Sequence, residues 1–269
     1  MKENYRRNDR KERFDRKDRN ELPEENEGQL EGRNALTEAL RSGRTIDKVF
    51  IAAGDTDRSL QRLAAQAKEA GAVVVPVDRR KLDAMSTTRS HQGVIALAAA
   101  REYYTIEDLL QEAADRGEAP LLVICDELSD PHNLGAIMRS AECAGAHGII
   151  IPKRRSEGLT AVVAKAAAGA VEYMKVARVT NINNAIAQLK EMGVWIFGTA
   201  AEGSVPMYQA DLTGPTAIVI GSEGDGMSQL VRKNCDVTVH IPMKGNITSL
   251  NASAAATVLL YEAVRQRLG

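Results

Sequence analysis

Short apolar runs, separated by amphipathic stretches with a helical period, recur along the chain from residue 28 onward. In the first block, residues 28–100, these runs are brief and alternate with two helical stretches. Strands that alternate with helices indicate layers packed on a central sheet, so this block predicts a small α/β domain. The predicted strands are 48–52, 72–77 and 93–99, and the predicted helices are 32–40 and 59–70.

The second block, residues 119–269, has nearly continuous apolar runs between its helical stretches. Such runs are typical of strands buried on both faces, and they predict a mostly parallel sheet covered by helices on both sides. Residues 101–118 show no strand pattern and hold one short helical stretch, 106–114, so we place the domain linker there. The predicted strands are 121–125, 148–151, 194–198, 217–220 and 237–241, and the predicted helices are 134–144, 159–168, 184–192 and 250–268.

Residues 1–27 differ from both blocks, because 18 of these 27 residues are charged, nine of each sign. Such a segment cannot bury enough apolar surface to offset the entropy of ordering, which predicts a disordered arm. Residues 1–19 carry a local charge of +4. Two interpretations of this arm remain open: a basic arm that contacts RNA phosphates, and a solubilising tail.

The composition narrows the class of protein. The formal net charge is −1 and aromatic residues make up 4%, which argues against a strongly basic coat protein and a broad base-stacking platform. The three cysteines form no CxxC pair and the four histidines show no metal-ligand spacing, so no metal site is predicted. No apolar run reaches membrane-spanning length and no signal-peptide pattern is present, so we expect a soluble, cytoplasmic protein.

Three loops of the second block carry unusual polar residues. The first follows the strand 121–125, and in it Asn133 stands where the next helix begins, with Arg139 six residues on. Ligands of open α/β sheets bind at the carboxyl ends of the strands, where such loops lie. A purely structural interpretation makes Asn133 a helix N-cap and Arg139 a surface ion-pair partner of Glu142.

The second loop, 221–226, reads GSEGDG and is neither a GxGxxG fingerprint nor a Walker loop. Its glycines let the backbone approach a flat ligand, but the Glu223 carboxylate repels a diphosphate. The third loop, 241–253, is rich in hydrogen-bonding groups, among them Ser249 and Asn251. Ser249 is also a favoured N-cap residue for the helix that follows, so a capping role is the structural alternative there.

These segments together resemble the SpoU family of RNA 2′-O-ribose methyltransferases, also called the TrmH family. The resemblance rests on DPHNLGAIMRSAECAG at 130–145, IVIGSEGDGM at 218–227 and IPMKGNITSLNASAAA at 241–256. These correspond to the three motifs of the family, in the family's order. Residues 28–100 are similar to the substrate-binding domain of longer members, through EGRNALTEAL and HQGVIALA, and that domain resembles small RNA-binding ribosomal proteins. The two-domain form resembles in particular the enzymes that methylate a guanosine of 23S ribosomal RNA.

The resemblance implies an α/β catalytic domain with a deep trefoil knot, of the SPOUT type, that works as a homodimer without a metal. It implies S-adenosylmethionine as the cofactor and RNA as the partner. Arg139 would activate the ribose 2′-hydroxyl, Asn133 and Asn251 would orient Arg139 and the ribose, and Glu223 would hold the guanidinium or a substrate hydroxyl. The implied cofactor-binding residues are Thr199, Gly221, Ile241, Met243, Ser249 and Leu250.

Two other functions stay open from the sequence. One is the same chemistry on a transfer RNA, and the other is a catalytically silent RNA-binding or ribosome-assembly protein. The presence of Asn133, Arg139, Glu223 and Asn251 argues against the silent protein.

Overall fold

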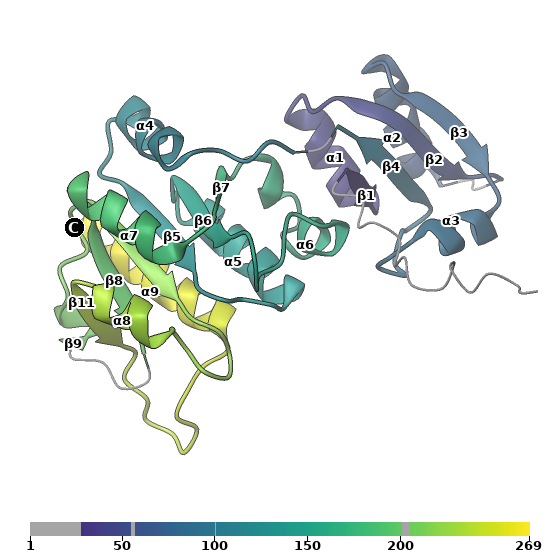
Figure 1. Ribbon diagram of the computed structural model, residues 1–269. Helices are drawn as coiled ribbons and strands as arrows, with labels where there is room; N and C mark the ends of the chain where they lie inside the picture. Colours follow the sequence, from purple (N-terminus) through teal and green to yellow (C-terminus); the bar gives the residue numbers. More distant parts are fainter. Residues whose placement is uncertain (1–27, 55–56, 100, 201–204) are drawn as a thin grey trace, which may run out of the picture.

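The computed structural model describes residues 28–54, 57–99, 101–200 and 205–269. It has two sheets, each with its own helices, and the chain passes from one to the other near residue 100 (Figure 1). The charged arm predicted over residues 1–27 lies outside the described residues. Within the described part of the chain, no helix is long and apolar enough to cross a membrane.

The N-terminal sheet has four strands in the order β1-β4-β2-β3. β2 and β3 are parallel, whereas β4 runs antiparallel to both β1 and β2. The ends of β1, β2 and β3 and the beginning of β4 therefore lie at one edge of this sheet. The elements are β1 (Gln29–Glu31), α1 (Arg33–Arg41), β2 (Ile46–Ala52), α2 (Arg58–Glu69), β3 (Val73–Val77), α3 (Arg79–Met85) and β4 (Val94–Ala98).

The C-terminal sheet has seven strands in the order β7-β6-β5-β10-β8-β11-β9, and every neighbouring pair is parallel. Its strands are β5 (Leu121–Cys125), β6 (Gly148–Pro152), β7 (Val176–Val179), β8 (Trp195–Thr199), β9 (Val205–Pro206), β10 (Thr216–Ile220) and β11 (Val237–His240). Its helices are α4 (Ile106–Arg116), α5 (Pro131–Cys143), α6 (Ala161–Ala166), α7 (Ile182–Glu191), α8 (Gln229–Asn234) and α9 (Ala252–Leu268), with 3₁₀ turns η1 (Ala170–Glu172) and η2 (Met207–Gln209). The predicted parallel α/β sheet is confirmed.

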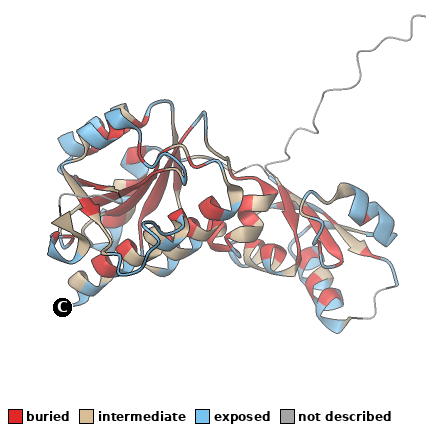
Figure 2. Ribbon diagram, turned by 90° about the horizontal axis from the view of Figure 1, so that it is seen from below, coloured by how far each residue is buried: buried red, intermediate tan, exposed pale blue. Residues whose placement is uncertain are grey.

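Successive side chains of β5 enter two different hydrophobic cores. Val123 and Cys125 pack with residues of α5, α6 and α9 on one face, whereas Leu122 and Ile124 pack with α4, α7 and α8 on the other. All five residues of β5 are buried, which is why the strand has no polar position. Figure 2 shows buried residues along both sheets and on the helix faces turned toward them.

The region predicted as the linker contributes α4 to the C-terminal fold. Ile106, Leu109 and Ala113 of α4 are buried in the core beneath that sheet, and Gly117 ends the helix in the left-handed conformation. Gly148 of β6 leaves room for this packing, because a Cβ there would lie 2.5 Å from a Leu109 methyl group. α4 is therefore packed on the C-terminal sheet and is part of that domain's core.

A buried carboxylate joins the two domains. The Glu172 side chain, at the end of η1, is only 3% exposed and pairs with the guanidinium groups of Arg44 and Arg101. Arg101 also donates to the carbonyl oxygen of Val171, and Ser42 Oγ donates to Glu172 at 3.3 Å. Two guanidinium groups around one buried carboxylate give the interface a direction-dependent contact that an apolar patch does not provide.

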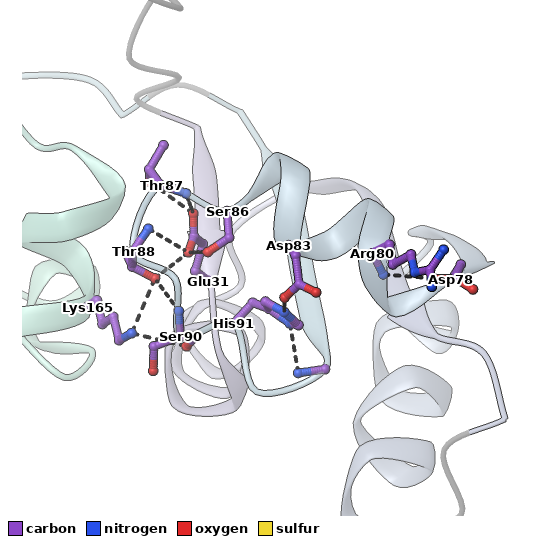
Figure 3. Close-up of polar contacts among 11 residues, drawn as sticks. Glu31, Asp78, Arg80, Asp83, Ser86, Thr87, Thr88, Ser90, His91 and Lys165 are labelled. Carbon is purple, nitrogen blue, oxygen red and sulfur yellow. Dashed lines mark hydrogen bonds and ion pairs between the residues drawn. The ribbon is translucent and has the colours of Figure 1, made fainter.

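A second polar contact joins the domains through the loop before β4 (Figure 3). Glu31 is buried and accepts hydrogen bonds from Ser86, Thr87 and Thr88, which fix this loop. Burial raises the pKa of Glu31, but the hydrogen bonds from Ser86 and its neighbours offset this and lower the pKa to about 2. Lys165 of α6 donates to Thr88 Oγ1 at 3.2 Å, so the loop touches the C-terminal domain.

Two expectations about the architecture stay predictions. One is the exact domain limits at residues 28, 100 and 119. The other is the passage of the C-terminal segment through a loop to form the trefoil knot.

Candidate active site

The three motif loops meet at the carboxyl edge of the C-terminal sheet. They follow β5, β10 and β11, which are close neighbours in the sheet. Asp126, directly after β5, donates its N–H to the carbonyl oxygen of Ile220 at the end of β10. Its carboxylate accepts the N–H of Ser228 at 2.9 Å, which ties the second loop to the first.

Asn133 lies in the first turn of α5 and is not the helix cap. Asp130 caps this helix, since its Oδ1 accepts the N–H of His132 at 2.9 Å and Pro131 occupies the first helical position. Asn133 is 5% exposed, and its Nδ2 donates to Asp130 Oδ2 at 2.9 Å. These hydrogen bonds, from Asn133 first and then from His132, lower the pKa of Asp130. The capping alternative for Asn133 is therefore wrong, and its side chain is free to face the other motifs.

Asn251 links all three motifs. Its Oδ1 accepts the N–H groups of Ser253 and Ala254 and caps α9, so its Nδ2 points outward. That Nδ2 donates to Asn133 Oδ1 at 2.9 Å and to Glu223 Oε1 at 3.4 Å. The cap of α9 is thus Asn251, and the capping alternative for Ser249 is wrong.

Arg139 lies further along α5, with its side chain exposed. Six residues separate it from Asn133, a rise of about 9 Å, so it does not join the Asn133–Asn251–Glu223 network. Among the described residues, its guanidinium has no hydrogen bond or ion pair, and the surface pair with Glu142 is not formed. A guanidinium without a partner is available to bind an incoming anionic or hydroxylated group.

Gly221 is required for the shape of the second loop. It is buried, and a Cβ built there would lie 2.2 Å from the backbone of Gly226 and of Met227. The turn itself closes through reciprocal backbone hydrogen bonds between Ser222 and Gly226, each 3.0 Å long. Glu223 therefore projects from the tip of a rigid turn.

Thr199, predicted to lie near the cofactor, ends β8 and is half-buried. Its hydroxyl donates to the carbonyl oxygen of Val219 in the neighbouring strand at 2.8 Å. This bond holds the ends of β8 and β10 together, so the contribution of Thr199 is to fix the edge on which the second loop stands.

The third loop presents apolar side chains to solvent. Ile241 packs partly against the core, whereas Met243, Ile247 and Leu250 are 36%, 73% and 41% exposed. Just before this loop, His240 Nδ1 is buried without a hydrogen-bond partner among the described residues. Exposed apolar groups beside an unsatisfied polar atom fit a ligand that has both apolar and hydrogen-bonding parts.

A cavity of about 410 Å³ opens beside Glu223. It lies between the turn at 222–225 and the loop at 127–130, and Arg155 closes one side with an ion pair to Glu127 at 3.0 Å. Asp130 and Arg155 were not singled out from the sequence. Their shared signal is a position in the loop that follows a buried strand, at the edge where ligands of parallel sheets bind.

In the described part of the chain, no group of three or more His, Cys, Asp or Glu side chains is placed to hold a metal ion. Cys125, next to the site, is fully buried, and this burial raises the pKa of its thiol to about 12. The thiol is therefore protonated and structural.

Comparison with known families gives the class of protein, an RNA-modifying methyltransferase with a separate substrate-binding domain. A family model described as RNA 2′-O ribose methyltransferase substrate binding matches residues 29–104, and the model of the SpoU rRNA Methylase family matches residues 120–261. The chain belongs to the SpoU rRNA methylase family, and the resemblance based on the three motifs is confirmed.

This chain matches two curated relatives over nearly the whole length of each relative. The putative TrmH family tRNA/rRNA methyltransferase YacO of Bacillus subtilis is 48% identical over 88% of this chain and 94% of its own. The 23S rRNA (guanosine-2′-O-)-methyltransferase RlmB of Ralstonia nicotianae is 44% identical over 88% of this chain and 95% of its own.

Solved structures with both domains are similar as well. The SpoU methyltransferase AviRb of Streptomyces viridochromogenes, in complex with the cofactor AdoMet, has a TM-score of 0.78 and 26% identity, covering 89% of this chain and 90% of its own. The AdoMet-bound rRNA methyltransferase of Sinorhizobium meliloti has a TM-score of 0.73 and 26% identity, covering 90% and 88%.

Proposed function

We propose that this protein transfers a methyl group from S-adenosylmethionine to a ribose 2′-hydroxyl of RNA, on a guanosine of 23S ribosomal RNA. The observation that carries the proposal is the hydrogen-bonded chain from Asn133 through Asn251 to Glu223. It brings one polar side chain from each of the three motifs to a single point, beside a cavity and an exposed apolar loop.

The site residues fit the implied cofactor. Met243 and Leu250 supply apolar surface for a purine and an alkyl chain, and the narrow turn at Gly221 allows close approach of backbone groups. Ile241 and Ser249 complete this loop, and Thr199 holds the strand ends beneath it. When bound, S-adenosylmethionine supplies a methyl group that its sulfonium activates, so that an O–C bond forms as the S–C bond breaks.

The difficult part of the reaction is the nucleophile, because an alcohol is weakly nucleophilic at its free pKa. The positively charged Arg139 guanidinium stabilises negative charge that develops on the ribose oxygen. The Glu223 carboxylate accepts a hydrogen bond from a substrate hydroxyl. Asn251 orients Glu223 through its Nδ2, and Asn133 fixes Asn251 in turn.

Arg139→Ala tests this assignment. We expect the variant to lose methyl transfer while its affinity for S-adenosylmethionine, measured by calorimetry, stays within a few-fold of wild type. Glu142→Ala, an exposed position on the same helix, is the control and keeps full activity. An equal loss of cofactor binding in Arg139→Ala contradicts the assignment to the hydroxyl.

Basic residues at one edge of the N-terminal sheet support the proposal that this domain binds RNA. Arg33 begins α1, Arg58 begins α2 and Arg79 begins α3, and Arg89 lies in the loop before β4. These elements begin at the same sheet edge, so the cations gather there, although Arg33 pairs with Asp57. Cations and helix N-termini are the groups that bind RNA phosphates.

The choice of RNA rests on the relatives. The Ralstonia protein is named for a guanosine of 23S rRNA, whereas the Bacillus protein is named for tRNA or rRNA, so transfer RNA is the second candidate. Incubation with labelled S-adenosylmethionine and separate ribosomal and transfer RNA pools distinguishes them. Label in a 2′-O-methylguanosine from 23S RNA supports the first, and label confined to transfer RNA supports the second.

We also propose that the protein is a homodimer that acts in the cytoplasm, where these RNAs reside. An exposed stripe on α9 supports the dimer, since Ala254, Val258 and Tyr261 lie near one face and Tyr261 is 47% exposed. Sedimentation equilibrium of wild type and Tyr261→Glu tests this proposal, and a monomeric wild type contradicts it.

A further inference from the structure

The loop between β6 and α6 carries three consecutive basic residues: Lys153, Arg154 and Arg155. Lys153 and Arg154 are exposed, and neither side chain has a hydrogen bond or ion pair among the described residues. Arg155 instead pairs with Glu127 and lines the cavity beside Glu223. β6 is the sheet neighbour of β5, so this loop stands next to the first motif loop.

The helix that follows this loop leads to the N-terminal domain. α6 lies between that domain and the rest of the C-terminal domain in Figure 1. Lys165 of α6 donates to Thr88 Oγ1 at 3.2 Å and to the carbonyl oxygen of Ser90 at 3.0 Å (Figure 3). α6 has six residues, a rise of about 9 Å, and it follows the basic loop in the chain, so one short helix links this loop to the contact at Thr88 and Ser90.

Arg89 stands between the two residues that Lys165 contacts. It is exposed, has a φ of 52°, and has no side-chain partner among the described residues. The buried Glu31 accepts the backbone N–H of Thr88 on one side of Arg89, and Lys165 donates to the Thr88 hydroxyl on that side and to the Ser90 carbonyl oxygen on the other. The loop thus presents the Arg89 guanidinium from a held backbone.

Three carboxylates along this route already have partners. Glu127 pairs with Arg155, Asp130 accepts two hydrogen bonds at the start of α5, and Glu31 is enclosed by hydroxyl groups. Lys153, Arg154 and Arg89 keep their positive charge without a partner. These three cations are therefore available to phosphates, although Glu223 and Asp225 place exposed carboxylates at the methylation end of the route and the chain as a whole has a net charge of −1.

We propose that Lys153 and Arg154 bind phosphates of the RNA segment that runs from Arg89 on the substrate domain to the methylation site. This inference rests on the proposed function. The chemistry is that of phosphate contacts, which position an RNA without reading its sequence. Because neither residue belongs to the Asn133–Asn251–Glu223 network, their loss weakens RNA binding and leaves the chemical step unchanged.

The test uses the full-length double variant Lys153→Ala/Arg154→Ala. Its RNA affinity and methyl transfer are measured on the same protein-free 23S ribosomal RNA across a salt titration. We expect roughly five- to thirtyfold weaker binding and a raised KM for RNA, with kcat at saturating RNA unchanged. The slope of log affinity against log salt falls by about 1.4–1.8, or 0.7–0.9 for each lost contact.

The control is Lys68→Ala/Lys233→Ala, which removes the same charge. Lys68 and Lys233 are exposed in the last turns of α2 and α8, away from the edges where those helices begin. The control keeps the wild-type salt slope. An unchanged slope and KM in Lys153→Ala/Arg154→Ala, or an equal change in the control, overturns the proposal.

Different results contradict the proposed function and the phosphate-binding role of Lys153 and Arg154. If the wild type binds RNA but methylates none, the proposed function is contradicted, whereas the slope difference still decides the role of Lys153 and Arg154. A drop in kcat at saturating RNA with the salt slope unchanged shows instead that the loop acts on the site, and this also overturns the phosphate-binding role.

Discussion

Asn251 is the residue whose removal tests the site most directly. In Asn251→Ala, α9 loses its N-cap, which costs about 1 kcal/mol. The same change leaves Asn133 Oδ1, on a side chain only 5% exposed, without its donor, which costs about 1–3 kcal/mol more. We therefore expect a loss of about 2–4 kcal/mol in the free energy of unfolding, measured by equilibrium urea denaturation.

The variant Asn251→Asp separates the two contributions. A carboxylate keeps both acceptor bonds to Ser253 and Ala254, so the cap survives. It cannot donate to Asn133 and it repels the Glu223 carboxylate at the same point. Methyl transfer should therefore be lost in both variants, with less loss of stability in Asn251→Asp. Full activity in Asn251→Asp, or a loss below about 0.5 kcal/mol in Asn251→Ala, refutes this reasoning.

Three further variants have definite expectations. Gly221→Ala should abolish cofactor binding, because its Cβ would lie 2.2 Å from backbone atoms, whereas Gly224→Ala has no atom within 4 Å and should bind normally by calorimetry. Glu31→Gln should cost about 3 kcal/mol at pH 7, since the pKa of Glu31 falls from 4.5 to about 2. That depressed pKa gives stability above pH 4.5 that is lost toward pH 2, so denaturation midpoints of variant and wild type should converge on acidification. Glu172→Gln breaks a buried ion pair, which costs about 3–5 kcal/mol where burial is complete, and should raise the radius of gyration in small-angle scattering; an unchanged radius contradicts the interdomain role.

The buried strands are the part of the fold that the sequence predicts best. β5 is apolar at every position and β10 at every position after Thr216, because helices cover both faces of the sheet, so both runs stand out in the sequence. The three motif loops follow from the same logic, since the carboxyl ends of parallel strands share one edge. Asn133, Glu223 and Asn251 meet there, whereas Arg139 stands apart from them, and the catalytic roles of these residues stay predictions.

Short and weakly buried elements escaped prediction for a physical reason. α3 has seven residues and buries only Leu82, so it has almost no periodic signal. β9 has two residues and exists because it pairs with β11, a contact between distant parts of the chain. Such elements depend on tertiary partners and not on local pattern.

The capping errors have a different origin. Asp, Asn and Ser are all good N-caps, so a polar loop before a helix offers several equivalent candidates. Pro131 decides the first case, because it fits the first helical position and makes Asp130 the cap. In the second case Asn251 is the cap of α9 and Ser249 is not, because the Asn251 side chain caps the helix with its Oδ1 and donates to Asn133 with its Nδ2.

The polar side chains of the site differ in whether their hydrogen-bonding groups already have partners within the protein. Asn133 and Asn251 have their amides fixed by partners within the protein, so they cannot turn toward a substrate without breaking those bonds. Glu223 is held by one long contact of 3.4 Å and keeps acceptor capacity, and Arg139 has no partner among the described residues. Under the proposed function, the two fixed amides orient one available carboxylate, and Arg139, which stands apart from them on α5, offers a cation; a reaction that moves a proton and builds negative charge on oxygen uses both groups. Substituting Asn133 or Asn251 should therefore disturb the orientation of Glu223. Substituting Arg139 should instead remove the charge that stabilises the ribose oxygen.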